Sequence, residues 1–189
     1  MRRETEAKIR VDSHGPLRAH LRELGATFVS RVVETNRILD RPDASLRRRG
    51  CGLRIRSAVA EVGDDVPATL TGKGPVVPGP FKSREEIELR IDDADAAADL
   101  LHLLGFVVIL RYRKRRESWR LGDCRIELDE PPHLGLFVEI EGPDEAAIQS
   151  TRDALGLGDA PVERASYVRM LLAYCDEHGV TDHSLLEGV

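Results

Sequence analysis

The chain is poor in cysteine, in aromatic residues and in long apolar runs, and each shortage excludes a class of protein. Its 189 residues contain three widely spaced cysteines, Cys51, Cys124 and Cys175. These few thiols indicate neither a disulfide framework nor a cysteine metal site, and they fit a reducing compartment. The longest apolar stretch, Phe106 to Leu110, is far too short to cross a bilayer, and the first residues are charged rather than apolar. We therefore expect a cytoplasmic protein with no membrane partner.

What the sequence has in abundance is charge of both signs. Charged residues make up 32% of the chain and hydrophobic residues 41%, and the net charge is only −5, which is a globular composition. The length suits one domain rather than two independent ones. We predict a single domain over residues 1–175, followed by a C-terminal tail over residues 176–189.

The pattern of apolar residues predicts many strands with a few helices between them. Residues 16–24, 92–104, 144–155 and 166–177 have the spacing and end signals of helices. Alternating runs predict strands at residues 4–11, 28–39, 53–60, 68–73, 84–91, 107–116, 118–128 (with a turn near Gly122-Asp123) and 136–141. The order lacks a regular βαβ alternation, so we predict an α+β protein built on an antiparallel sheet.

Charge recurs at every second position within these strands. Glu4, Glu6 and Lys8 leave their strand on one face, and the residues between them form a mostly apolar face. The same pattern is present in Arg54 and Arg56, in Glu86 and Glu88, in Arg125, Glu127 and Asp129, and in Glu139 and Glu141.

Two interpretations of these charged rows stay open. For any single strand, the ordinary one is a solvated face with charges paired across strands. The repetition over most strands favours a second interpretation, in which the sheet closes and gathers acids and bases into one cavity. Helices would then cover the apolar outer face.

A cavity with both signs of charge suits a polyphosphate with its metal ion. Arginine and lysine donate hydrogen bonds to phosphate oxygens, and carboxylates are hard oxygen ligands for Mg²⁺ or Mn²⁺. Nucleic acid is disfavoured as a partner, because glutamates beside the arginines repel its backbone and the few aromatic residues form no evident stacking platform.

The charged blocks resemble those of the CYTH superfamily, the triphosphate tunnel metalloenzymes. Glu4-Thr5-Glu6-Ala7-Lys8 is similar to the family's N-terminal ExExK signature. Two features depart from the family's cyclase-like members: Gly72 stands where an aromatic residue is frequent, and Pro131-Pro132-His133 replaces a more acidic turn. The resemblance continues through Asp40-Arg41-Pro42-Asp43, Leu46 to Gly50, Leu53 to Arg56, Leu70 to Pro75, Ser83 to Glu88, Lys114 to Arg116, Leu128 to Glu130, Leu134-Gly135 and Phe137 to Glu141.

This resemblance implies a fold and a set of site residues. The fold is a closed eight-stranded antiparallel β-barrel, or tunnel, with flanking helices. The implied metal ligands are Glu4, Glu6, Glu139 and Glu141. The implied phosphate-binding residues are Lys8, Arg54, Arg56, Lys73, Arg84, Lys114 and Arg116, with Lys8, Lys73 and Asp129 in catalytic roles and Glu86, Glu88 and Glu127 in supporting roles.

The implied function is metal-dependent cleavage of a phosphoanhydride bond, with three alternatives. The first is a class IV adenylate cyclase, which converts ATP to cyclic AMP and pyrophosphate. The second is a triphosphatase acting on inorganic, nucleoside or thiamine triphosphate. The third is an inactive module that binds polyphosphate or nucleotide. The resemblance also makes a homodimer a reasonable expectation.

Overall fold

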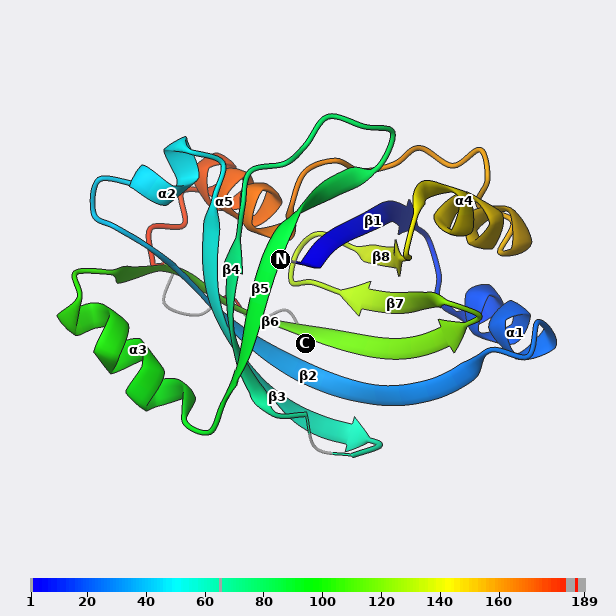
Figure 1. Cartoon of the computed structure of the whole chain (residues 1–189), viewed down its shortest axis with the longest axis horizontal. Coiled ribbons are helices and arrows are strands. Elements are labelled where there is room, and N and C mark those ends of the chain that lie inside the picture. The colour runs from blue at the N-terminus through cyan, green and yellow to red at the C-terminus, as the bar shows by residue number, and fades with distance from the viewer. Residues whose placement is uncertain (1, 65, 183–185, 187–189) are drawn as a thin grey trace.

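The protein is an antiparallel β-barrel with helices on its outside and at one end (Figure 1). The computed structural model describes residues 2–64, 66–182 and 186. Eight strands close in the order β1-β5-β4-β3-β2-β6-β7-β8, and β1 completes the circle by pairing with both β5 and β8. The predicted closed barrel is therefore confirmed.

The element bounds follow the sequence pattern closely. The strands are β1 (Arg2–Val11), β2 (Thr27–Asp40), β3 (Gly52–Val62), β4 (Ala68–Lys73), β5 (Lys82–Ile91), β6 (Val107–Leu121), β7 (Cys124–Glu130) and β8 (Leu136–Glu141). The helices are α1 (Gly15–Glu23), α2 (Ser45–Arg48), α3 (Ala94–Leu103), α4 (Glu145–Ala154) and α5 (Tyr167–His178).

Side-chain capping explains where three helices begin. The Asp93 carboxylate accepts from the backbone N–H groups of Asp95 and Ala96 at the start of α3. Asp144 caps α4, and Ser166 caps α5 by accepting from the N–H of Arg169. Each of these polar side chains satisfies backbone donors that have no partner within the first turn.

One predicted strand boundary is wrong. The sequence suggested a break between residues 116 and 118, but β6 runs without interruption from Val107 to Leu121. Glu117, the residue at the expected break, accepts hydrogen bonds from Arg18, Arg31 and the Trp119 indole. These contacts satisfy a carboxylate that is only 2% exposed, so the strand carries a buried charge through its middle.

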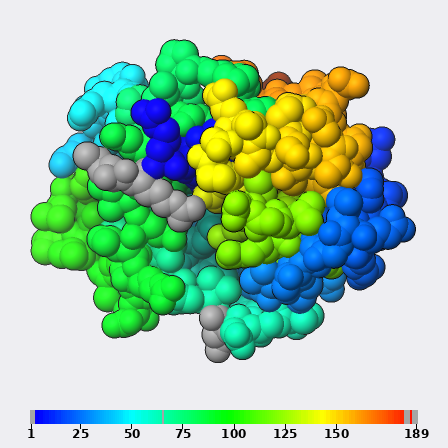
Figure 2. Space-filling view, turned by 45° about the vertical axis from the view of Figure 1, so that its right-hand side comes forward, coloured from blue at the N-terminus to red at the C-terminus, as the bar shows by residue number. Residues whose placement is uncertain are grey.

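The outer face of the barrel packs on α1 and α4. Ala7 and Ile9 of β1 and Ile126 and Ile140 of the neighbouring strands form one apolar cluster with residues that include Leu21 of α1 and Ile148 of α4. These strand residues alternate with the charged ones, so their burial outside the barrel forces the charges into the lumen. Figure 2 shows α4, in gold, and α1, in blue, covering this side of the molecule.

Helix α5 packs on the inward side of the sheet. Phe137 shares its strand face with Glu139 and Glu141, yet it forms a second apolar cluster with Tyr167 and Leu171 of α5. The apolar part of the lumen is therefore covered by this helix, while the charged part is left for a cavity.

The chain after α5 returns to the barrel. Leu186 exchanges backbone hydrogen bonds with Arg111 and Arg113 of β6 and is 6% exposed. The predicted boundary between residues 175 and 176 falls inside α5, and Leu186 of the predicted tail is buried in the second apolar cluster. Residues 183–185 and 187–189 of the predicted tail lie outside the described residues.

No helix in the described part of the chain is long and apolar enough to span a membrane.

Candidate functional site in the tunnel

The barrel encloses a large cavity that combines charged and apolar walls. Its volume is about 1570 Å³. The lining extends from Leu172 and Asp176 of α5 to Arg120 and Asp123 near the turn between β6 and β7, so the cavity follows the length of the barrel. Of the predicted site residues, it is lined by Glu4, Glu6, Arg54, Arg56, Lys73, Arg84, Glu86, Glu88, Lys114, Arg116, Glu139 and Glu141.

Strand pairing places acids and bases opposite one another around the wall. Glu4 lies opposite Arg84 in the β1–β5 pair, and Lys8 lies opposite Glu139 in the β1–β8 pair. Cross-strand neighbours on one face are about 4.5–5.5 Å apart at Cβ, which is within ion-pair reach. The charged rows therefore interlock into one network when the barrel closes.

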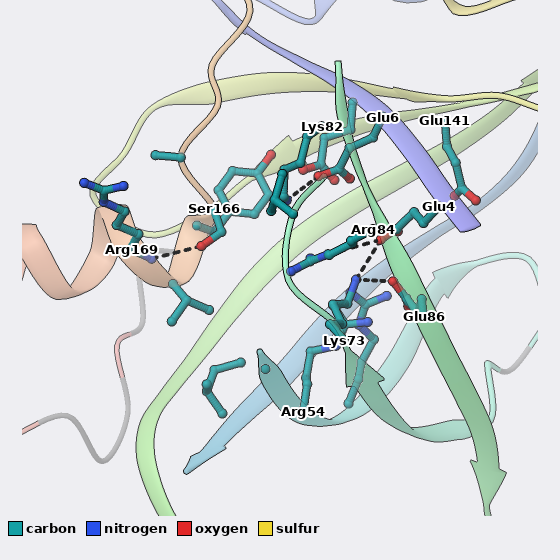
Figure 3. Close-up of a pocket in the computed structure, with 18 of the residues that line it drawn as sticks. Glu4, Glu6, Arg54, Lys73, Lys82, Arg84, Glu86, Glu141, Ser166 and Arg169 are labelled. Carbon is teal, nitrogen blue, oxygen red and sulfur yellow. Dashed lines mark hydrogen bonds and ion pairs between the residues drawn. The ribbon is translucent and has the colours of Figure 1, made fainter. Parts of the chain in front are cut away.

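Lys73 stands at the centre of one part of this network (Figure 3). Its ammonium lies 3.1 Å from a Glu4 oxygen and 2.6 Å from a Glu86 oxygen. Arg84 approaches the same Glu4 oxygen at 3.8 Å. Burial and the neighbouring Arg54 lower the pKa of Lys73, and Glu4 and Glu86 oppose that shift. Lys73, Arg84 and Arg54 thus bring three basic groups together around Glu4 and Glu86 in this corner.

Arg54 and Arg56 form the adjoining wall from β3. Arg56 contacts Glu34 at 3.1 Å and donates to the Asn36 amide oxygen. Arg54 lies 3.8 Å from Glu88, its Nη2 donates to the Thr71 hydroxyl, and burial and Arg56 lower its pKa. Two guanidinium groups at alternate positions of one strand thus face the cavity, as the sequence predicted.

Lys114 and Arg116 hold a deeper part of the network. Both contact Asp129, at 2.8 and 2.6 Å, and Arg116 also donates to Glu139. Burial alone would raise the pKa of Asp129, but Arg116 and Lys114 hold it below the usual value. Asp129 is fully buried, and its two basic partners keep it ionised, so it anchors both of them.

Three predicted site residues lie behind the surface of the cavity. Lys8, Glu127 and Asp129 do not line it within the described residues. Lys8 donates to the Ala165 carbonyl oxygen at 2.7 Å, and Glu127 accepts from the Ser118 hydroxyl. All three side chains are therefore held by hydrogen bonds to other residues of the protein.

The predicted metal ligands lie together on β1 and β8. Glu6 is opposite Glu141 in register, and Glu4 and Glu139 follow on the same faces. Glu6 has a basic partner in Lys82, and Glu4 and Glu139 each have two. Accordingly, no group of three or more histidine, cysteine, aspartate or glutamate residues in the described ranges is arranged to hold a metal ion.

The electrostatics of these carboxylates nevertheless fit a divalent cation. Burial raises the pKa of Glu139, and the neighbouring Glu6 raises it further, although Lys8 and Arg116 bring it below the usual value. Burial likewise raises the pKa of Glu6, Lys82 brings it below the usual value, and the neighbouring Glu4 opposes Lys82. A hard cation relieves this repulsion between oxygen ligands, provided that the carboxylates exchange their basic partners for the ion.

Sequence reasoning missed several residues of the site. Lys82 contacts Glu6 at 2.5 Å and lies on the same face as Arg84, so an earlier strand start would have revealed it. Glu34 and Asn36 lie two residues apart on one face of β2, so the same alternation of polar residues could have identified them. Ser166 and Arg169 lie at the cavity's edge across from β1 and β5 (Figure 3), and no local pattern marked them as lining residues.

Comparison with known proteins agrees with this architecture. The model of the CYTH domain matches residues 2–164. Adenylate cyclase CyaB of Aeromonas hydrophila is 32% identical over 146 residues, which cover 71% of this chain and 70% of that protein. A solved structure from Pyrococcus horikoshii is 29% identical with a TM-score of 0.77, over 90% of this chain and 99% of that one.

A further solved structure, from Hippeastrum, is described as revealing a dominant triphosphatase activity. It has a TM-score of 0.70 at 19% identity, over 90% of this chain and 96% of that one, and this likeness shows the fold. The residues that match the CYTH model contain all eight strands and every residue predicted for the site. The chain belongs to the CYTH family.

Proposed function

We propose that this protein is a divalent-metal-dependent enzyme that acts on a triphosphate, and that its reaction is the conversion of ATP to cyclic AMP and pyrophosphate. The likeness to adenylate cyclase CyaB supports this choice within the family. The predicted cytoplasmic location and homodimer stay predictions.

The observation that carries the proposal is the division of one cavity into two chemical parts. Six of the predicted phosphate-binding side chains line the charged part from four strands, and they are Arg54, Arg56, Lys73, Arg84, Lys114 and Arg116. The part beneath α5 has an apolar wall of Ile38, Ile109, Val168 and Leu172, beside the charged Arg169 and Asp176 of the same helix. A nucleoside triphosphate has the matching division, because its phosphates are anionic and its base has two apolar faces.

The basic residues would bind and orient the phosphates. Arginine forks suit bidentate contacts with phosphate oxygens, and a buried lysine places a compact charge against one of them. Lys73 lies between Glu4 and Glu86, so both carboxylates hold its ammonium in place. Donors fixed before the substrate arrives stabilise charge that develops in the transition state.

Glu4, Glu6, Glu139 and Glu141 would hold Mg²⁺ or Mn²⁺. When bound there, the ion supplies a positive charge that polarises phosphate oxygens. Lys82 and Arg116, which pair with Glu6 and Glu139, would then turn toward phosphate instead. Glu86, Glu88 and Glu127 would keep their basic neighbours in position.

The test is turnover of three substrates in parallel. The purified protein is incubated with Mg²⁺ or Mn²⁺ and with ATP, inorganic triphosphate or thiamine triphosphate, and products are resolved by chromatography. A Glu4→Gln/Glu6→Gln variant controls for contaminating enzymes. Cyclic AMP with pyrophosphate, lost in the variant, is the expected result.

Other products would overturn the cyclase assignment in distinct ways. Orthophosphate without cyclic nucleotide would make the protein a triphosphatase, the activity described for the Hippeastrum protein. Triphosphate binding without turnover of any of the three would leave an inactive binding module.

A further inference from the structure

The first residue of α5 sits among the buried lysines of the lumen. Tyr167 is 6% exposed and packs its ring edge-on against Phe137, with the ring centroids 5.3 Å apart. The Lys8 ammonium lies over the Tyr167 ring at 4.1 Å from its centroid, and the Lys114 ammonium at 5.0 Å. One aromatic ring thus contacts two predicted phosphate-binding residues from different strands.

These two lysines need such a partner. Each side chain is 2% exposed, so neither ammonium is held by bulk water. Lys8 and Lys114 also repel one another. Their carboxylate partners, Glu139 at 3.6 Å and Asp129 at 2.8 Å, are shared with Arg116. The negative face of an aromatic ring attracts a desolvated cation without occupying its N–H donors. Lys114 donates to Asp129 and lines the cavity, so its remaining donors stay available for phosphate oxygens.

The backbone before α5 fixes the ring in this position. Glu163 donates its backbone N–H to the Lys8 carbonyl oxygen at 2.7 Å, and Val162 forms a bridge with Ile9 of β1. The Ala165 carbonyl oxygen accepts a hydrogen bond from the Lys8 ammonium, and the Ser166 hydroxyl caps the helix. The segment is therefore tied to β1 at several points immediately before Tyr167.

We propose that Tyr167 is a positioning residue, whose ring holds the Lys114 ammonium in place for phosphate at the cavity wall and fixes the Lys8 ammonium in the layer behind it. It lies beyond residues 2–164, which match the family model, so that match assigns it no role. The inference rests on the proposed function, because it requires that the lumen bind a triphosphate.

The test measures binding rather than turnover. The affinity of the full chain for inorganic triphosphate is measured by calorimetry in EDTA, without metal, for wild type, Tyr167→Phe, Tyr167→Leu and Leu171→Ala. Phe keeps the ring and removes the hydroxyl, whereas Leu removes the ring. Leu171 is buried on the same helix, so its variant controls for loosening of α5. A melting curve for each variant confirms that it is folded at the temperature used.

We expect Tyr167→Leu to weaken binding about tenfold and Tyr167→Phe to stay within about twofold of wild type, because the ring makes the cation contacts. Wild-type affinity in Tyr167→Leu would overturn the inference, as would an equal loss in Leu171→Ala. A loss in Tyr167→Phe as large as about tenfold would overturn it too, even if the Leu variant did not fold. If wild type binds triphosphate neither in EDTA nor with Mg²⁺ added, the proposed function is overturned, and the inference with it.

Discussion

Arg116 donates two parallel hydrogen bonds to Asp129, from Nε to Oδ1 at 2.7 Å and from Nη2 to Oδ2 at 2.6 Å. Asp129 is 0% exposed and also accepts from Lys114. A bidentate pair in a buried site has good geometry and little competition from water. This carboxylate therefore anchors the part of the wall that carries Lys114 and Arg116.

Asp129→Asn is expected to destabilise the protein strongly. The change leaves Arg116 and Lys114 buried with less countercharge, and breaking such a pair costs about 3–5 kcal/mol. Urea unfolding at neutral pH measures the loss. Asp43→Asn is the matched control, because the Asp43–Arg48 pair is exposed and its removal should leave the unfolding midpoint unchanged. Equal stability of the two variants would contradict the anchoring role.

Stability is expected to fall in acid. The pKa values of Glu34 and Asp129 lie below those of ordinary carboxyls, because their basic neighbours outweigh the effect of burial. Groups with lowered pKa values stabilise the fold above their unfolded pKa, which is about 4, and lose that contribution as the pH falls toward the folded value.

The measurement is the free energy of unfolding between pH 7 and pH 3. Wild type should lose stability below about pH 5. Glu34→Gln should show a shallower slope, since one of the two groups no longer takes up a proton on unfolding. An identical slope in both proteins would show that Glu34 is not the source.

Glu6→Gln is expected to weaken Mn²⁺ binding by about tenfold or more, because a charged oxygen ligand is lost. Titration of Mn²⁺ followed by electron paramagnetic resonance gives the affinity without any substrate. Glu85→Gln, on the exposed outer face of β5, is the control and should bind like wild type. EDTA should abolish turnover, and added Mn²⁺ should restore it. Unchanged affinity in Glu6→Gln would remove this residue from the proposed ligand set.

Lys73→Gln is expected to lower kcat/KM by about 10²–10³, the usual cost of one preorganised donor. The effect follows from its central place between Glu4 and Glu86. Arg90→Gln, which removes an exposed base on β5, is the control. Steady-state kinetics on ATP compare the two. If Arg90→Gln loses as much as Lys73→Gln, general electrostatic attraction explains the effect better than a fixed contact.

The sequence by itself determined which residues share a face. Strand alternation is local, since side chains two apart point the same way whatever the strand pairs with. Glu4 and Glu6, Arg54 and Arg56, and Glu139 and Glu141 were therefore assigned correctly to one surface before any fold was known. The resemblance to the CYTH family supplied the closed barrel and the number of its strands, which alternation alone leaves open.

Only the tertiary structure decided which of these charges meet. The register of β1 against β5 pairs Glu6 with Lys82, and that of β6 against β7 buries Asp129 between Arg116 and Lys114. The position of Tyr167 over two lysines depends on how α5 enters the barrel from a distant part of the chain. Such contacts are set by strand register and helix packing, which are properties of the whole closed sheet rather than of any segment.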